Sequence, residues 1–285
     1  MVYDVKQLEL HVTHACNFTC EGCSHYSNHG HKGNITLEEC EEWLYTWSKR
    51  IRPKVFTILG GEPTLHRDLP DILYMVRGMF PDPYTEIDLI TNATGLHLHP
   101  KLPHILLATQ ANLAVSIHSI EHMNYVRKFK RGYEIAKDWK NGMGVHVEFW
   151  DFTNKEWIRQ YKGYGDKMMP FEDENPKKSW KHCISKDALQ LHEGKLWKCP
   201  PLAYLPMQAE KYNLSAKWDE YLKYKPLEVE CTDEELKNFL NKKEESFCSM
   251  CPANEVEPYT KPDPTMPISY WENRNDNMGD VIRES

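Results

Sequence analysis

The sequence lacks any long apolar run, and no stretch approaches the roughly 18 consecutive apolar residues that a membrane-spanning helix needs. The start of the chain has neither a basic segment nor an apolar core, so we expect no signal peptide and a cytoplasmic location. Positive charge is also scarce, because 35 basic residues face 42 acidic ones and the formal net charge is −7. This balance argues against binding of nucleic-acid backbones as the main activity and gives no sign of a membrane partner.

Strand and helix patterns alternate along the first 160 residues. Period-two patterns predict strands, and apolar residues at helical spacing predict helices. A capping box at Thr36–Glu39 marks the start of the first helix. The predicted strands are 6–12, 54–59, 86–91, 113–118 and 145–150, and the predicted helices are 36–49, 68–79, 124–140 and 155–161. This alternation is typical of parallel strands in an α/β barrel or a doubly wound sheet.

The pattern changes after residue 165. Two short segments around Glu193 and Gly194 predict a β-hairpin, and Thr232 caps a charged helix predicted at 233–243. The tail contains several prolines and no clear periodicity. We therefore expect an α/β fold, in which a partial (β/α) barrel carries a small C-terminal hairpin-plus-helix extension. The expected units are 1–175 for the barrel, 176–253 for the extension and 254–285 for an irregular tail.

Polar residues recur on one face of the predicted strands, since alternate residues of a strand point to the same side. A polar interior would hold a ligand, whereas a filled barrel is packed with branched apolar side chains. The alternative is an antiparallel sheet with this face in solvent, which the intervening helices disfavour. The polar sets are Glu9, His11 and Thr13; Ser116 and His118; and His146, Glu148 and Trp150. We take His118, His146 and Glu148 as candidate catalytic groups, although supporting or core positions would suit them equally.

The chain has nine cysteines, and an odd number without an export signal argues against a disulfide framework. Cys16, Cys20 and Cys23 form a C-x3-C-x2-C motif directly after the first strand. Three thiolates on one loop can hold three corners of a 4Fe–4S cluster and leave one iron open. The alternative is a zinc site completed by a nearby histidine. The available histidines are His14, His25, His29 and His31.

A second group of cysteines flanks the predicted hairpin and helix. Its members are Cys183, Cys199, Cys248 and Cys251. Four thiolates suit either zinc or a second 4Fe–4S cluster. Cys231 could replace one of these ligands, but it and Cys40 more simply serve as small apolar residues.

The N-terminal motif is followed by a second one, Gly60-Gly61-Glu62-Pro63, at the end of the next strand. Together they resemble the radical S-adenosylmethionine (SAM) superfamily. The resemblance implies a 4Fe–4S cluster on Cys16, Cys20 and Cys23, with SAM chelating the open iron. It also implies SAM contacts from Gly60, Gly61, Glu62 and Pro63, and from Asn92 and Ser116. Many members have an aromatic residue where this chain has Gly22, which puts the adenine contact in doubt.

The second cysteine group resembles the Twitch extension of radical SAM enzymes, and its spacing is similar to that of 2-deoxy-scyllo-inosamine dehydrogenases. This likeness implies an auxiliary 4Fe–4S cluster as electron acceptor and a reductant such as flavodoxin or ferredoxin. It also implies that a 5′-deoxyadenosyl radical removes hydrogen from a small-molecule substrate. The expected reaction is oxidation of a secondary alcohol in an aminocyclitol, sugar or nucleotide sugar, with the hydroxyl proton taken by His118, His146 or Glu148.

Other reactions remain open at the level of sequence. Within the superfamily they are epimerisation or isomerisation, modification of a base or nucleotide, and peptide modification. The first strand begins close to Met1, so we expect no leader-binding domain of the kind that peptide modification usually needs. A zinc-stabilised binding module without catalysis is the alternative from another class.

Overall fold

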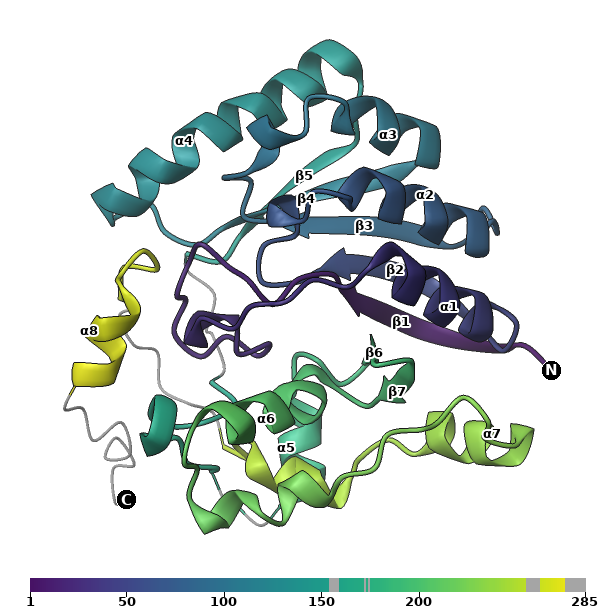
Figure 1. Cartoon of the computed structure of the whole chain (residues 1–285), viewed down its shortest axis with the longest axis vertical. Helices are drawn as coiled ribbons and strands as arrows, with labels where there is room; N and C mark the ends of the chain where they lie inside the picture. Colours follow the sequence, from purple (N-terminus) through teal and green to yellow (C-terminus); the bar gives the residue numbers. More distant parts are fainter. Residues whose placement is uncertain (154–158, 172, 174, 255–261, 275–285) are drawn as a thin grey trace.

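Seven strands form one open, mostly parallel sheet (Figure 1). The structure, a computed structural model, describes residues 1–153, 159–171, 173, 175–254 and 262–274. The strand order is β5-β4-β3-β2-β1-β6-β7, and only the β6–β7 pair is antiparallel. The strands are β1 (Tyr3–His11), β2 (Ile51–Leu59), β3 (Glu86–Thr91), β4 (Ala111–Ile117), β5 (Val147–Asp151), β6 (Ala188–His192) and β7 (Lys195–Trp197). This arrangement confirms an α/β fold of the partial-barrel kind.

The helices fall into two groups (Figure 1). The first covers one face of the sheet and comprises α1 (Leu37–Ser48), α2 (Leu69–Met79), α3 (Leu102–Thr109) and α4 (Met123–Asp138). The second follows β5 and comprises α5 (Pro176–His182), α6 (Pro200–Lys211), α7 (Asp233–Asn241) and α8 (Ile268–Asn273). In the residues described, no helix combines the length and the apolar character needed to cross a bilayer.

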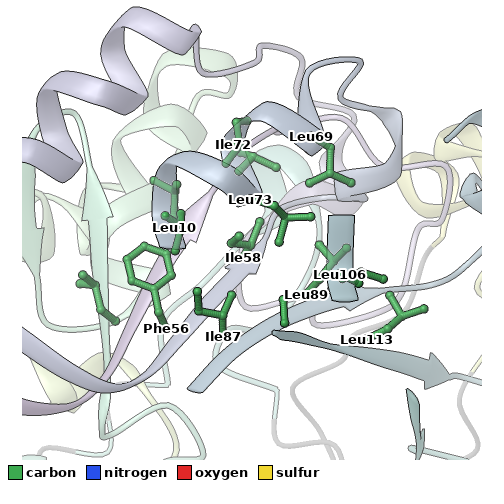
Figure 2. Close-up of a cluster of buried hydrophobic side chains, with 14 of the residues drawn as sticks. Leu10, Phe56, Ile58, Leu69, Ile72, Leu73, Ile87, Leu89, Leu106 and Leu113 are labelled. Atoms are coloured by element: carbon green, nitrogen blue, oxygen red, sulfur yellow. The ribbon is translucent and has the colours of Figure 1, made fainter. Parts of the chain in front are cut away.

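The apolar alternation of the strands builds the core beneath the first group of helices. Leu10, Ile58 and Leu89 are completely buried and lie in successive strands of the sheet. Figure 2 shows these side chains against Ile72 and Leu73 of α2. Parallel strands under a helical layer need such a continuous apolar face. The opposite face of the same strands is therefore left for the polar residues.

The predicted elements in the first half of the chain are confirmed, with ends that differ by a few residues. The capping box is confirmed too, because Glu39 N donates to Thr36 Oγ1 at 3.1 Å and Thr36 N donates to Glu39 Oε2 at 2.8 Å. The helix predicted at 155–161 falls largely outside the described residues. Helices α3, α5, α6 and α8 were not predicted, because prolines stand at their starts and interrupt the helical pattern.

The hairpin of the predicted extension exists as β6 and β7, but it also continues the main sheet. Leu8 of β1 pairs with Leu189 of β6 in parallel. The side chain of Gln190 donates to Glu9 Oε2 at 2.6 Å, which adds a second link between these strands. The proposed boundary near residue 175 therefore crosses a continuous hydrogen-bonded sheet, and the division into units stays a prediction.

Candidate functional site

The first cysteine group lies on the loop at residues 13–34, between β1 and α1; we call it the cysteine loop. Burial raises the pKa of the Cys16 thiol well above its usual value, and the charges of Cys20, Glu62 and Cys23 raise it further. These effects require the sulfur atoms to share one poorly solvated region. Thiolates in such a region need a positive partner, and a bound metal centre would supply it.

Backbone N–H groups surround the third cysteine of the loop. Burial raises the pKa of the Cys23 thiol, and hydrogen bonds from the backbones of His25, Ser27, Asn28 and Tyr26 oppose that rise. A sulfur with this many backbone donors is stabilised when it carries negative charge. The loop conformation therefore fits a metal-bound thiolate at Cys23.

The glycines of the Gly60–Pro63 segment lie against the base of the cysteine loop. The Gly61 N–H donates to the Thr13 carbonyl at 2.6 Å. A Cβ atom at Gly60 would lie 2.7 Å from that same oxygen, and one at Gly61 would overlap the Ala15 carbonyl. These glycines allow a close approach, and the group that approaches them in the structure is the chain's own backbone. Contact of this segment with SAM stays a prediction.

Glu62 joins the end of β2 to the end of β3. Its side chain is 1% exposed, and burial raises its pKa. Oε1 accepts hydrogen bonds from the hydroxyls of Thr64 and Thr91, both at 2.5 Å, and Oε2 accepts one from Asn92 N at 2.7 Å. Both oxygens are thus engaged within the protein, and the carboxylate fixes the backbone on either side of it.

Asn92 continues this connection to the cysteine loop. Its Nδ2 donates to Asn17 Oδ1 at 2.9 Å, and its Oδ1 accepts from Thr94 Oγ1 at 2.6 Å. Ser116 is buried near the end of β4, where its carbonyl accepts from Tyr125 at 3.4 Å. Asn92 therefore lies beside the predicted cluster loop, as the predicted SAM contact requires. Ser116 is in β4, which is separated from β1, the strand before the loop, by β3 and β2.

The three candidate catalytic groups do not come together. His118 follows the end of β4, and its ring centroid lies 6.2 Å from that of Phe18 in the cysteine loop. His146 precedes β5, and its backbone carbonyl accepts a hydrogen bond from Leu113 near the start of β4. The positions of His118 and His146 along the strand direction therefore differ by about five residues. At 3.3 Å per residue, this is roughly 17 Å.

His146 and Glu148 form a pair on the edge strand β5. Their side chains are 62% and 52% exposed, with Nε2 and Oε1 3.3 Å apart. The second oxygen of Glu148 accepts from Trp150 Nε1 at 2.9 Å. Hydrogen bonds from Trp150 and His146 hold the pKa of Glu148 below its usual range. Exposure and this low pKa make Glu148 a poor proton acceptor, so His118 is the best placed of the three.

The polar face predicted for β1 is buried. Gln7 Nε2 donates to Glu9 Oε1 at 2.8 Å and to Thr57 Oγ1 at 3.1 Å. Gln190 bridges Glu9 and Tyr204, because the Tyr204 hydroxyl donates to Gln190 Oε1 at 3.1 Å. A connected, water-poor polar network on this face excludes the alternative of a solvent-facing antiparallel sheet for β1.

Beside this network lies a cluster of imidazole rings that the sequence did not predict as a unit. The His11 ring centroid lies 4.6 Å from that of His14, 5.2 Å from His25 and 4.7 Å from Tyr204. Burial lowers the pKa of His11 well below its usual value and that of His192 to about 3. The His11 and His192 rings are therefore neutral near pH 7. His192 lies in this cluster because β6 pairs with β1, and no local sequence motif indicates that pairing.

The second cysteine group also assembles in one place. The four members come from the end of α5, the start of α6 and the turn after α7: Cys183, Cys199, Cys248 and Cys251. All four line one cavity of about 370 Å³. Burial raises the pKa of the Cys251 thiol well above its usual value, and the charges of Cys183, Cys199 and Cys248 raise it further. We call these four the auxiliary cysteines.

Cys231 lies elsewhere. Its sulfur accepts a hydrogen bond from Arg50 Nη1 at 3.1 Å, and Arg50 also binds the carboxylate of Asp233 at 3.1 Å. Cys231 does not line the cavity of the auxiliary cysteines. The geometry therefore favours the four predicted ligands over a set that includes Cys231.

Neither thiol set, as the structure describes it, has the geometry of a site for a single metal ion. Across the described ranges, no group of three or more His, Cys, Asp or Glu side chains is placed to hold one metal ion. A cubane cluster, by contrast, takes each cysteine ligand on a separate iron. Soft thiolate donors suit iron–sulfur clusters as well as zinc.

Comparison with known proteins shows what the first half of this chain is similar to. Residues 10–143 match the family model of the Radical SAM superfamily. A nucleotide dehydratase dependent on S-adenosylmethionine, from Selenomonas ruminantium, is 31% identical over 121 residues, or 42% of this chain and 40% of the relative. A GTP 3′,8-cyclase from Tolumonas auensis is 32% identical over 116 residues, or 40% of this chain and 33% of the relative. The N-terminal half of the chain is thus similar to radical SAM proteins, and the similarity covers both the cysteine loop and the Gly60–Pro63 segment.

Solved structures overlap with about half of the chain. Native anSMEcpe with bound AdoMet matches with a TM-score of 0.40 and 17% identity, covering 52% of this chain and 43% of that one. Streptococcus suis SuiB bound to S-adenosylmethionine matches with a TM-score of 0.40 and 16% identity, covering 53% of this chain and 35% of that one. The chain spans less than half the length of the two curated relatives described above.

Proposed function

We propose that this chain is a radical SAM enzyme with an auxiliary 4Fe–4S cluster, and that it oxidises a secondary alcohol of a small polar substrate. The observation that carries the proposal is the presence of two separate thiol sets. One is the cysteine loop beside Gly60–Pro63, and the other is the set of auxiliary cysteines around their own cavity. Three ligands leave an open iron for SAM, whereas four ligands close the second site.

The roles of the chain's residues at the first site follow from their positions. Cys16, Cys20 and Cys23 hold the cluster, and the backbone donors around Cys23 stabilise its sulfur charge. Glu62 and Asn92 fix the strand ends that face the loop, and Gly60–Pro63 and Ser116 complete the SAM site. The bound cluster and SAM together supply a 5′-deoxyadenosyl radical that removes hydrogen from carbon.

Oxidation of a secondary alcohol removes a hydrogen atom from carbon, a proton from the hydroxyl and one further electron. We assign the proton to His118, which lies nearest to the cysteine loop among the candidate groups. The auxiliary cysteines hold a Twitch-type cluster, and a cluster bound there supplies an acceptor for the electron. A flavodoxin or ferredoxin would reduce the first cluster.

The substrate class rests on the buried polar face of the sheet. Glu9 and Gln190 already bond to each other, so the buried imidazoles of His11 and His192 beside them are the groups left to bind a polar ligand. Such a surface suits a hydroxyl-rich or amino-bearing molecule, because buried polar groups need partners. An aminocyclitol, a sugar or a nucleotide sugar has this chemistry.

A second candidate is redox-neutral modification of a nucleotide. It is favoured by the names of the curated relatives, which are a nucleotide dehydratase and a GTP cyclase. In that case the auxiliary site would bind the substrate or stabilise the fold, and it would not accept an electron. The two candidates share the first site and differ in the fate of the last electron.

Metal analysis after anaerobic reconstitution tests the two-cluster proposal. We expect about eight irons per chain, and about four in either Cys16→Ala or Cys199→Ala. Only Cys199→Ala should still cleave SAM reductively, because the loop that leaves an iron open is intact there. A colourless protein with stoichiometric zinc would instead support a binding module. Reductive SAM cleavage by Cys16→Ala would contradict the assignment of the loop.

Isotope transfer tests the reaction type. With substrate deuterated at the carbinol carbon, we expect deuterium in 5′-deoxyadenosine and a product that has lost two hydrogens. A product isomeric with the substrate that carries solvent hydrogen at that carbon would make the enzyme an epimerase or isomerase. A nucleotide product without net oxidation would favour the second candidate.

A further inference from the structure

Tyr26 is a buried residue whose polar atom has no partner. Its side chain is 1% exposed, and in the described part of the chain its hydroxyl makes no hydrogen bond. The backbone N–H donates to the Cys23 carbonyl at 3.0 Å, so the residue belongs to the cysteine loop. A buried phenol normally finds a partner, and a missing one indicates a group that the protein chain does not itself provide.

The side chain of Tyr26 extends from the cysteine loop toward the auxiliary cysteines. It belongs to a buried cluster with Trp197 and Met250, and Cys199 and Cys251 pack against this cluster. Burial raises the pKa of Tyr26 well above its usual value, and the charges of Cys251, Cys199 and Cys23 raise it further, in that order. The hydroxyl therefore stays protonated and is a hydrogen-bond donor between the two thiol sets.

The backbone of Tyr26 is held in an unfavourable conformation to place the ring there. Its φ of 55° and ψ of 13° lie in the left-handed region, which bulky residues rarely adopt. Such strain persists where the surroundings fix it, and it is most common at functional sites. The Tyr161 ring, at 5.1 Å between centroids, packs beside Tyr26 and helps to hold it.

We propose that the Tyr26 hydroxyl donates a hydrogen bond to a sulfur of the auxiliary cluster and thereby raises the reduction potential of that cluster. The inference rests on the proposed function, because it requires a cluster on the auxiliary cysteines. A hydrogen bond to a cluster sulfur stabilises the more negative, reduced form. The loop that holds the SAM-binding cluster would thus also set how readily the second cluster accepts an electron.

Tyr26→Phe removes the hydroxyl and keeps the ring, and Tyr161→Phe is the matched control. Tyr161 is equally buried in the same cluster, but its hydroxyl is already paired with Asn28, whose Nδ2 donates at 3.1 Å. Redox titration of the reconstituted full chain, monitored by electron paramagnetic resonance, measures the reduction potentials of both clusters. Added SAM identifies the first cluster, because only that one has an open iron.

For Tyr26→Phe we expect the ratio of reduced to oxidised auxiliary cluster to fall about tenfold at a fixed potential, which is 59 mV for a one-electron couple. The SAM-responsive cluster should keep its potential, and Tyr161→Phe should leave the auxiliary cluster unchanged. A second measurement needs no variant: the auxiliary cluster of the wild-type chain should show a nearby proton coupling that disappears in D2O.

The outcomes that would contradict the role of Tyr26 differ from those that would contradict the auxiliary cluster itself. About eight irons with unchanged auxiliary potential and no exchangeable proton would overturn the role of Tyr26 and leave the proposed function standing. A shift confined to the SAM-responsive cluster would also overturn it, because the hydroxyl would then face the first site. About four irons, with no cluster signal that is insensitive to SAM, would overturn the proposed function and the inference together.

Discussion

Gly61 has no room for a side chain, because the Ala15 carbonyl and the Cys16 Cβ occupy the space where its Cβ would stand. The sequence identified Gly60 and Gly61 correctly as positions of close approach. In the structure the groups that lie close are the Thr13 and Ala15 carbonyls, and a short motif cannot tell whether an approaching group is a ligand or another part of the backbone. That distinction depends on how the loop after β1 folds back onto the end of β2.

We therefore expect Gly61→Ala to lower thermal stability as well as SAM affinity. The added methyl group must displace the base of the cysteine loop, at a cost of about 1–3 kcal/mol. Gly78→Ala is the control, because Gly78 lies in α2 with nothing within 4 Å of its added Cβ. Thermal unfolding of both variants checks this. A Gly61→Ala protein as stable as the control would contradict the packing.

The imidazole cluster predicts a loss of stability in acid. Burial lowers the pKa of His192 from 6.5 to about 3, so the unfolded chain binds a proton there that the folded chain does not. Its contribution to stability is full above pH 6.5 and is lost as pH falls toward 3. At pH 5 the loss from one such group is about 2 kcal/mol.

His192→Gln should therefore lose less stability between about pH 7 and about pH 5 than the wild-type chain does, by roughly that amount. Denaturant unfolding at the two pH values measures the difference. His104→Gln, at an exposed position on α3, should keep the wild-type dependence. Equal pH dependence in wild type and His192→Gln would contradict the assignment of a neutral buried ring.

At the scale of elements, the first half of the chain was predictable because each strand and helix carries its own period. Helix α6 was not, since Pro200, Pro201 and Pro206 lie within it and a proline removes a backbone donor. The pairing of β6 with β1 was not predictable either. Hydrophobic patterns identify a strand but do not identify its neighbour, which here lies 181 residues away in the chain.

Strand position separates the candidate bases. His118 lies past the end of β4, where active sites of such sheets lie, while His146 precedes β5. We expect His118→Gln to lower product formation by about 100-fold or more, with 5′-deoxyadenosine still formed. His146→Gln should change the rate by no more than about twofold. Comparable losses in both variants, measured by product yield per deoxyadenosine, would refute the assignment of the base.

At the scale of the whole molecule, distant segments of the chain meet at both thiol sets. The composition of the auxiliary set was predictable from its C-x-x-C motif and the flanking hairpin. The exclusion of Cys231 was not, because it depends on Arg50, which lies 181 residues earlier in the chain. Arg50 also accounts for the position of α7, since it binds Asp233 at the first turn of that helix.

Iron content should therefore distinguish Cys248, a predicted cluster ligand, from Cys231. Cys248→Ala is expected to retain about four of about eight irons, because it removes an auxiliary ligand. Cys231→Ala should retain all of them and lose only a small amount of stability, since it removes one partner of Arg50 among several. Chemical iron analysis after anaerobic reconstitution checks both. Iron loss in Cys231→Ala with full iron in Cys248→Ala would reverse the ligand assignment.

The C-terminal segment contacts the cysteine loop, and α8 lies to one side of that loop in Figure 1. Thr19, between the first two cysteines of the loop, donates from its backbone to the Pro264 carbonyl at 2.7 Å and from its hydroxyl to the Met266 carbonyl at 2.6 Å. Thr19 and Pro264 are 245 residues apart in the chain. At about 5–20 residues per second, a ribosome needs roughly 12 to 50 s to make that stretch. In each newly synthesised chain, the cysteine loop therefore stays without its C-terminal hydrogen-bond partners for at least that long.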